Sequence, residues 1–444
     1  SIENPMAENN NQDSEHRTPA SDLRSPISDR SSPSGSGPRL EKPVRITEQV
    51  WPEGTVPVVS VFCITYNHVN FIRDAIEGFL MQETTFPVEI FIHDDASTDG
   101  TDEIVKEYAE KYPKLFWTVL QTENQWSKGN PNTHFFKLMQ GQRGEFIALC
   151  EGDDYWIDKE KLQKQVEKLE KDATIVGCCH EVLTNHPTSK TGFLFNNYST
   201  LGASQNIGLR HLLSKNCFAT CSVLIRSKSL SNLPDSFRSF AMGDWPMWIW
   251  ATKYGEFFVD PQPMGFYRYH DGGIWSTLSV NKQLLEMIKM LSGISIMIDN
   301  KYEDSATEGL IDLFFPIVAD AFLNSNYKEF KIAKKYIESS KWDKKLFLKK
   351  LSFKILESKI IDNNIIGLKK IKNCYEIALY IEKSFSMNCV SSNEAKKKLA
   401  NSVTSRAWLN KLHDPFSTVS LIILSFLIMI QISAGNLRTA AIKQ

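Results

Sequence analysis

Short apolar runs alternate with segments of helical periodicity from residue 58 onward, and this alternation constrains the fold more than any other feature. The runs are rich in β-branched and aromatic residues, as expected for strands that are buried on both faces of a sheet. Between them, apolar residues recur at the spacing of one helix face. Strands that alternate with helices predict an α/β protein with a doubly wound sheet. The expected strands are 58–64, 88–93, 116–120, 145–150, 175–180 and 221–226, and the expected helices are 71–80, 102–112 and 242–252.

The segments on either side of this region differ in composition. Residues 1–45 are rich in Ser, Pro, Asn, Asp and Arg, so we expect disorder because too little apolar surface is available to offset the entropy of ordering. Residues 46–280 would form the α/β domain. Residues 281–413 are predicted to be mostly helical, and this helical region is a candidate oligomer contact.

The last part of the chain, 414–444, contains an uncharged stretch. Residues 415–437 carry no charged side chain, and their centre reads "VSLIILSFLIMIQISA". A membrane span needs about 20 mainly apolar residues, so this stretch predicts contact with a membrane; a buried helix or an oligomer contact is the alternative. Lysines at 396–398 suit an anionic cytoplasmic leaflet.

Charge and cysteine content narrow the function classes. A net charge of -1 gives no reason to expect a nucleic-acid partner. The lysine-rich stretch 328–372 faces either an anionic partner or only solvent. The eight cysteines include no paired CxxC motifs at zinc-finger spacing, and residues 1–45 show no apolar core of a signal peptide. We therefore expect reduced core cysteines in a cytoplasmic protein.

Polar residues follow the first two expected strands, at the edge where α/β sheets bind ligands. "TYN" (65–67) ends the first strand, where it either contacts a planar ligand or only forms a turn. Asp94 and Asp95 end the second strand. They precede the cap of the next helix, for which Asp99 and Thr101 are the candidates. An EF-hand is excluded because the twelfth position of such a loop is Lys106 instead of Glu.

The motif "CEGDDYW" (150–156) places three acids directly after a buried strand. Unpaired buried charge is costly, and hard divalent cations prefer carboxylate ligands and bridge to phosphate oxygens. We therefore expect one or two of the three acids, Glu151, Asp153 and Asp154, to hold a divalent ion against a diphosphate. The alternative is a structural ion-pair cluster with Lys159 or Lys161.

Two later motifs supply further candidates. Asp244 lies among tryptophans in "MGDWPMW" (242–248), where aromatic surroundings raise a carboxylate's pKa and suit it to proton abstraction, and the rings suit sugar faces. A helix N-cap is the alternative. "YRYHDGGIW" (267–275) offers Arg268 for phosphate and His270 for a metal.

Taken in order, these motifs resemble glycosyltransferase family 2, the inverting enzymes with a nucleotide-sugar-binding GT-A fold. The resemblance covers about residues 57–275. It rests on "VSVFCITYNHVNFIRDAIEGFLMQ", "IHDDASTDGTDEIV", "ENQWSKGN" and "GEFIALCEGDDYWIDKEKLQKQVEKLE".

The resemblance implies a role for each motif. Asp153 would bind a divalent cation, Mn²⁺ or Mg²⁺, with His270 as a further ligand. Glu151 stands where the family usually has Asp, and Asp244 would be the catalytic base, although the usual Glu-Asp pair is Gly-Asp here. Arg268 would lie near the diphosphate. The residues implied to hold the nucleotide are Thr65, Tyr66, Asn67, Asp94 and Asp95.

The implied reaction transfers one sugar from a nucleotide-diphosphate sugar to a hydroxyl of a saccharide or lipid-linked acceptor, with inversion. The Gln-x-x-Arg-Trp motif of processive synthases is absent after Asp244. The expected setting is surface polysaccharide or glycolipid synthesis at the cytoplasmic membrane face. One alternative is a nucleotidyltransferase, which would need a glycine-rich loop where this chain has "TYNHVNF". The other is an inactive nucleotide-sugar-binding membrane scaffold, whose signature would be missing acids.

Overall fold

In the computed structural model the chain forms two compact units. The first comprises the residues up to Leu209 together with Cys217–His270, and the second comprises Arg210–Asn216 and the residues from Asp271. The structure describes residues 38–129, 139, 142–187, 189, 205–273, 275–324, 327–343, 346–347 and 350–351.

A mixed sheet forms the centre of the first unit. Its parallel half has the order β5-β4-β2-β6, and β2 is buried along almost its whole length, as its apolar sequence predicts. The strands of this half are β2 (Val59–Thr65), β4 (Val88–Asp94), β5 (Phe116–Leu120) and β6 (Phe146–Leu149).

The other half departs from a purely parallel doubly wound sheet. The short strand β10 (Leu224–Arg226) lies antiparallel between β6 and β8 (Ile175–Thr184), whereas β11 (Glu256–Tyr267) runs parallel to β8. Two further strands, β7 (Tyr155–Trp156) and β9 (Gln205–Ile207), pair antiparallel with β11. The expected strand at 221–226 is thus shorter, since Thr220–Ser222 form a 3-10 turn instead.

The three helices predicted at 71–80, 102–112 and 242–252 are present, and two helices that were not predicted accompany them. α1 (Ile72–Leu80) buries six of its residues, and the absence of a side chain at Gly78 lets it approach β7, because a Cβ there would lie 2.9 Å from the backbone nitrogen of Trp156. The other helices of this unit are α2 (Thr101–Lys111), α4 (Lys161–Lys171) and α7 (Asp244–Ala251), while α6 (Leu209–Ser214) falls at the boundary between the units.

A small second sheet lies at the start of the described chain. β1 (Val44–Arg45) pairs antiparallel with β3 (Glu83–Thr84), and Arg45 Nε donates to the carbonyl of Leu80. The end of segment 1–45 is therefore ordered, contrary to the expected disorder, because a neighbouring strand satisfies its backbone. Residues 1–37 lie outside the described residues.

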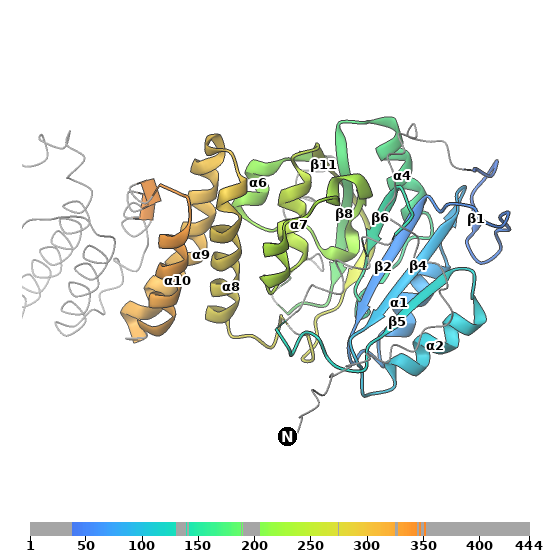
Figure 1. Ribbon diagram of the computed structural model, residues 1–444, viewed down its shortest axis with the longest axis horizontal. Coiled ribbons are helices and arrows are strands. Elements are labelled where there is room, and N and C mark those ends of the chain that lie inside the picture. Colours follow the sequence, from blue (N-terminus) through green and yellow to red (C-terminus); the bar gives the residue numbers. More distant parts are fainter. Residues whose placement is uncertain are drawn as a thin grey trace, which may run out of the picture. The chain divides into compact units, whose positions relative to one another are not determined.

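The second unit is helical over its described residues, in agreement with the sequence (Figure 1). α8 (Val280–Gly293) contacts both α9 (Glu303–Asn324) and α10 (Tyr327–Ser339), and Phe314 packs against Phe330 with ring centroids 5.4 Å apart. Among the described helices, none combines the length and the apolar character needed to cross a bilayer. The uncharged stretch 415–437 lies outside the described residues.

Reduced core cysteines are confirmed wherever the structure describes them. The six described cysteines, at positions 63, 150, 178, 179, 217 and 221, are reduced and buried. The thiols of Cys63, Cys150 and Cys221 have raised pKa values, mainly because they are buried. They therefore remain protonated at neutral pH.

Candidate active site

The carboxyl ends of β2 and β4 lie side by side, and the loops that follow them are joined by hydrogen bonds. Thr65 and Asp94 are paired in register. Asn67 adopts a left-handed backbone with φ 54°, its side-chain oxygen accepts from the Thr98 backbone N–H at 2.8 Å, and its own N–H donates to Ser97 Oγ at 2.8 Å. Asn67 therefore shapes the loop, a role for which Asn is suited by its tolerance of positive φ.

Asp99 links the same two loops and supports the start of α2. Its carboxylate accepts from the backbone N–H groups of Thr101 and Val69, each at 3.0 Å. Gly100, with φ 96°, occupies the N-cap position itself. Asp99 thus accepts a hydrogen bond from the start of α2, as expected, but from the position one residue before the N-cap.

Asp94 and Asp95 are both buried and both hold backbone. Asp94 accepts hydrogen bonds from the N–H and the hydroxyl of Ser97. Burial raises the pKa of the Asp94 carboxyl, although these two hydrogen bonds act to lower it. The two oxygens of Asp95 accept from the backbone N–H groups of Gln125 at 2.8 Å and Trp126 at 3.1 Å. These two acids therefore fix the loops at the strand ends, including the loop that follows β5.

The acidic turn Glu151–Asp154 lies at the end of β6, directly beside β2. Gly152 donates its N–H to the Ile64 carbonyl at 2.8 Å. Thr65 is buried, its hydroxyl has no partner among the described residues, and Tyr66 follows it, half-buried. The acidic turn can thus approach the "TYN" loop closely, because Gly152, the residue at the contact, has no side chain.

Asp153 is the point where three chain segments meet. His270 Nε2 lies 3.0 Å and His68 Nε2 lies 3.6 Å from Asp153 Oδ2. Burial disfavours ionisation of Asp153, but the hydrogen bond from His270 and the proximity of His68 outweigh it and lower the pKa of this carboxyl. The predicted proximity of Asp153 and His270 is therefore seen in the geometry.

Glu151 and Asp154 show the opposite shift. Burial raises the pKa of Glu151, and repulsion from Asp154, Asp153 and Asp244 adds to it. Burial and repulsion from Asp153 also raise the pKa of Asp154, although the Arg268 N–H donates to it at 2.8 Å. Three carboxyls in one turn cannot all ionise cheaply without an additional cation.

Arg268 braces this turn from the end of β11. Its guanidinium donates to the Asp153 carbonyl at 2.9 Å and to Asp74 Oδ2 at 2.8 Å. It also lies between two rings, 4.7 Å from the centroid of Phe71 and 4.9 Å from that of Tyr155. The side chain predicted to contact phosphate is therefore firmly held against the acidic turn.

Asp244 is the first residue of α7 and lies close enough to Glu151 to raise its pKa. The N-cap position belongs to Gly243, so Asp244 is not the cap. Two of its aromatic neighbours, Trp245 and Trp248, are 2% and 0% exposed. Those rings form core, and they do not offer the sugar-binding surface considered from the sequence.

The alternative that the acids of the turn form an ion-pair cluster with Lys159 or Lys161 is wrong. Lys159 Nζ lies 3.0 Å from Glu83, and Lys161 Nζ donates to Gln165 at 2.7 Å. Both lysines thus have other partners than Glu151 and Asp153.

The donor atoms fit a divalent cation. Two groups, His68–Asp153–His270 and Glu151–Asp153–Asp154, each bring ligand atoms within 4.8 Å of one another. Carboxylate oxygens and imidazole nitrogens are the ligands of Mn²⁺ and related ions. Sequence reasoning missed His68, whose only signal is its position directly after the "TYN" motif.

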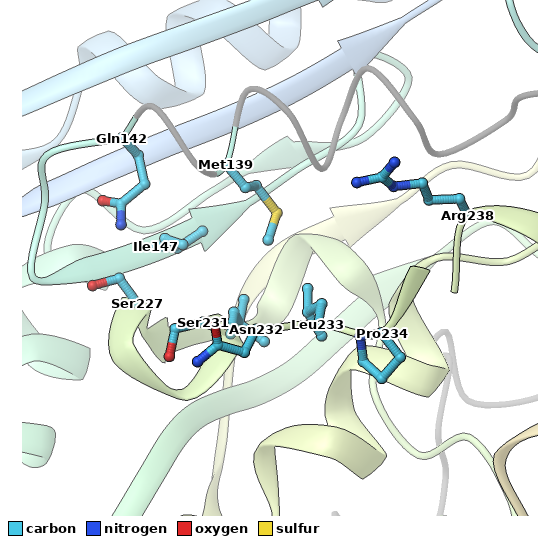
Figure 2. Close-up of a pocket in the computed structure, with 10 residues that line it drawn as sticks. Met139, Gln142, Ile147, Ser227, Ser231, Asn232, Leu233, Pro234 and Arg238 are labelled. Atoms are coloured by element: carbon cyan, nitrogen blue, oxygen red, sulfur yellow. The ribbon is translucent and has the colours of Figure 1, made fainter. Parts of the chain in front are cut away.

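A separate cavity of about 280 Å³ lies at the other end of β6. It is lined by Ile147 of β6 and by residues that follow β10, and in Figure 2 the side chains of Met139 and Leu233 face one another across it. Because β10 runs antiparallel to β6, this cavity lies away from the acidic turn. Its lining contains no carboxylate, so we place the candidate active site at the turn.

Comparison with solved structures defines the class of fold. The S. aureus TarS 1-349 crystal structure matches with a TM-score of 0.50 at 15% identity, over 77% of this chain and 91% of that chain. The same protein has also been solved in complex with UDP-GlcNAc. The fold is thus that of the GT-A glycosyltransferases, as the motifs predict.

Sequence comparison then shows which family this domain resembles. Residues 60–229 match Glycosyl transferase family 2. An uncharacterized Mycobacterium tuberculosis protein is 35% identical over 226 residues, 51% of this chain and 62% of that protein. TuaG of Bacillus subtilis, assigned to teichuronic acid biosynthesis as a glycosyltransferase, is 35% identical over 25% of this chain and 41% of its own length. The chain thus spans less than two thirds of these relatives.

Proposed function

We propose that this protein is an inverting glycosyltransferase, which moves one sugar from a nucleotide-diphosphate sugar to an acceptor hydroxyl in surface polysaccharide or glycolipid synthesis. The observation that carries the proposal is the convergence of Asp153, Glu151 and Asp244 beside the loops that hold Asp94 and Asp95. On this proposal, one edge of the sheet would combine a cation site, a base and the loops that hold the nucleotide.

The donor would lie along the ends of β2, β4 and β6. Tyr66, which is half-buried, and Thr65 beside it would lie next to the nucleoside, and the buried carboxylates of Asp94 and Asp95 keep the loops at these strand ends in place. Asp153 and His270 would hold Mn²⁺ or Mg²⁺. That ion would supply positive charge against the developing charge of the leaving diphosphate.

Asp244 is the proposed general base. It would accept the proton of the acceptor hydroxyl as that oxygen attacks the anomeric carbon from the face opposite the leaving group. Such a single displacement inverts the anomeric configuration. Glu151, whose pKa is raised by burial and by the neighbouring acids, would remain protonated more readily and hydrogen-bond the donor.

The test is a screen of nucleotide-sugars for nucleoside diphosphate release, with Mn²⁺ or Mg²⁺, on the full chain. Asp153→Asn and Asp244→Asn should each lower turnover by a factor of about 10² to 10⁴, whereas Asp235→Asn on an exposed 3-10 turn should not. Full activity in both site variants would refute the assignment. Donor binding without turnover would favour the inactive scaffold.

We also propose that residues 415–437 keep the protein at the cytoplasmic face of the membrane, because they carry no charge and follow a lysine-rich region. Deletion of 415–444 should move the protein from the membrane fraction to the soluble fraction. An unchanged distribution after cell fractionation would rule this out.

A further inference from the structure

We propose that His68 is a third protein ligand of the metal ion at Asp153, so that two imidazoles and one carboxylate hold the ion. The inference rests on the proposed function, since it concerns the same cation site. It adds a residue from the loop after β2 to ligands that otherwise come from β6 and from the end of β11.

Asp153 Oδ2 is the centre of the proposed ligand set. His270 Nε2 lies 3.0 Å from it and His68 Nε2 3.6 Å, and the three ligand atoms all lie within 4.8 Å of one another. In an octahedral site with metal–ligand distances of about 2.1 Å, neighbouring ligand atoms are about 3 Å apart and opposite ones about 4.2 Å. The observed spacing therefore accommodates one ion with small side-chain adjustments.

The backbone fixes His68 at this place. Its N–H donates to Thr101 Oγ1 at 2.8 Å, and its carbonyl accepts from the N–H groups of Phe71 and Ile72, each at 2.8 Å, where α1 begins. The side chain is only 13% exposed. Because the residue is held between the starts of α1 and α2, little conformational entropy would be lost when it binds a metal ion.

The imidazole of His68 lacks the hydrogen bonds that a structural histidine of this burial would have. Its Nδ1 is buried and has no partner among the described residues. Its Nε2 lies 3.6 Å from Asp153, which is too far for a hydrogen bond. Nε2 is therefore the nitrogen that an ion beside Asp153 would contact, whereas Nδ1, which lies next to Gly152, would stay outside the coordination shell.

Charge balance also favours an ion at this place. Glu151, Asp153 and Asp154 form one turn, and the permanent charge of Arg268 is shared with Asp74. Three carboxyls beside a single shared guanidinium leave an excess of negative charge, which a divalent cation would balance.

This ligand set also predicts metal preference. Imidazole nitrogen suits transition-metal ions, whereas Mg²⁺ prefers carboxylate, carbonyl and water oxygens. A site with two nitrogens should therefore bind Mn²⁺ or Co²⁺ in preference to Mg²⁺.

The test measures Mn²⁺ binding to the full chain by electron paramagnetic resonance, with Mn²⁺ alone and with UDP or GDP added. Electron spin echo modulation counts the coordinated imidazole nitrogens. We expect two imidazoles in the wild type and one in His68→Gln, with a Kd at least about 10-fold weaker. His211→Gln, an exposed histidine on α6, should leave both the count and the Kd unchanged.

One imidazole in the wild type, an unchanged count in His68→Gln, or no Mn²⁺ binding with or without nucleotide would overturn the assignment. If His68→Gln does not fold, His270→Gln decides: one imidazole remains if His68 is a ligand, and none if it is not. Two imidazoles in a protein that turns over no nucleotide-sugar would leave the ligand set standing and refute the proposed function.

Discussion

Gly152 packs directly against Thr65. A Cβ at position 152 would lie 2.6 Å from Thr65 Oγ1 and 3.0 Å from His68 Nδ1. The residue between Glu151 and Asp153 must therefore have no side chain if the acidic turn is to reach the end of β2. This contact ties the acidic turn Glu151–Asp154 to the loop after β2, two segments separated by more than eighty residues of sequence.

Replacing this glycine should damage both stability and activity. In Gly152→Ala the new methyl group would push the turn away from β2, and we expect a loss of about 1–3 kcal/mol in the free energy of unfolding with weaker Mn²⁺ binding. Denaturant titration and the EPR assay measure the two effects. Gly208→Ala is the control, because there the Cβ would meet only the flexible carboxylate of Glu256, at 3.0 Å. Wild-type values for Gly152→Ala would show that the close approach is not needed.

Asp95 should control the order of the loop after β5. Because its two oxygens accept from Gln125 and Trp126, Asp95→Asn removes one acceptor and the charge, at a cost of about 1–3 kcal/mol. Hydrogen exchange in a peptide covering 121–129 should become faster. Asp102→Asn, on the exposed side of α2, should leave that exchange unchanged. Equal protection in Asp95→Asn and wild type would contradict this role.

Arg268 should not be replaceable by lysine. A single ammonium cannot donate to both Asp74 and the Asp153 carbonyl while lying between Phe71 and Tyr155. Arg268→Lys should therefore lose about 1–3 kcal/mol of stability and bind Mn²⁺ more weakly. Arg73→Lys is the matched control, since its bond to Glu107 is exposed and such pairs contribute little. Similar melting curves for the two variants would refute the bracing role.

The sequence predicted the elements whose apolar pattern is long and regular. β2 and α1 follow from continuous and helix-spaced apolar residues, and the acids at 94–95 and 151–154 follow strand ends as expected. The antiparallel direction of β10 could not be predicted, because a three-residue strand carries no signal of its orientation.

Within the site, local patterns could indicate candidates but not their partners. The contacts of Asp153 with His270 and of Arg268 with Asp74 join residues more than a hundred positions apart. Asp95 looked like a ligand residue, yet its carboxylate is bonded to backbone that comes thirty residues later. His68 had no distinguishing spacing, and only the fold brings it to Asp153.

Because of Lys161, the free energy of unfolding should change with pH in the alkaline range. It is 0% exposed, and burial lowers its pKa from 10.5 to about 8. Between these values the unfolded chain holds the proton that the folded protein has released, so stability rises with pH through that window. Below about pH 8 the buried charge costs up to about 3 kcal/mol. Lys161→Met removes this dependence.

Relative to Lys161→Met, the wild type should therefore gain about 1–3 kcal/mol between pH 7 and pH 10, measured by denaturant titration at each pH. Lys159→Met provides the control, because Lys159 is exposed and pairs with Glu83, so its curve should keep the wild-type slope. The ammonium of Lys161 is stabilised by its hydrogen bond to Gln165 and by the ring of Trp156, whose centroid lies 4.2 Å from Nζ. We therefore expect the gain in the free energy of unfolding to be smaller than the full cost of burying the charge. Parallel curves for the wild type and Lys161→Met would mean that Lys161 has an ordinary pKa in the folded protein.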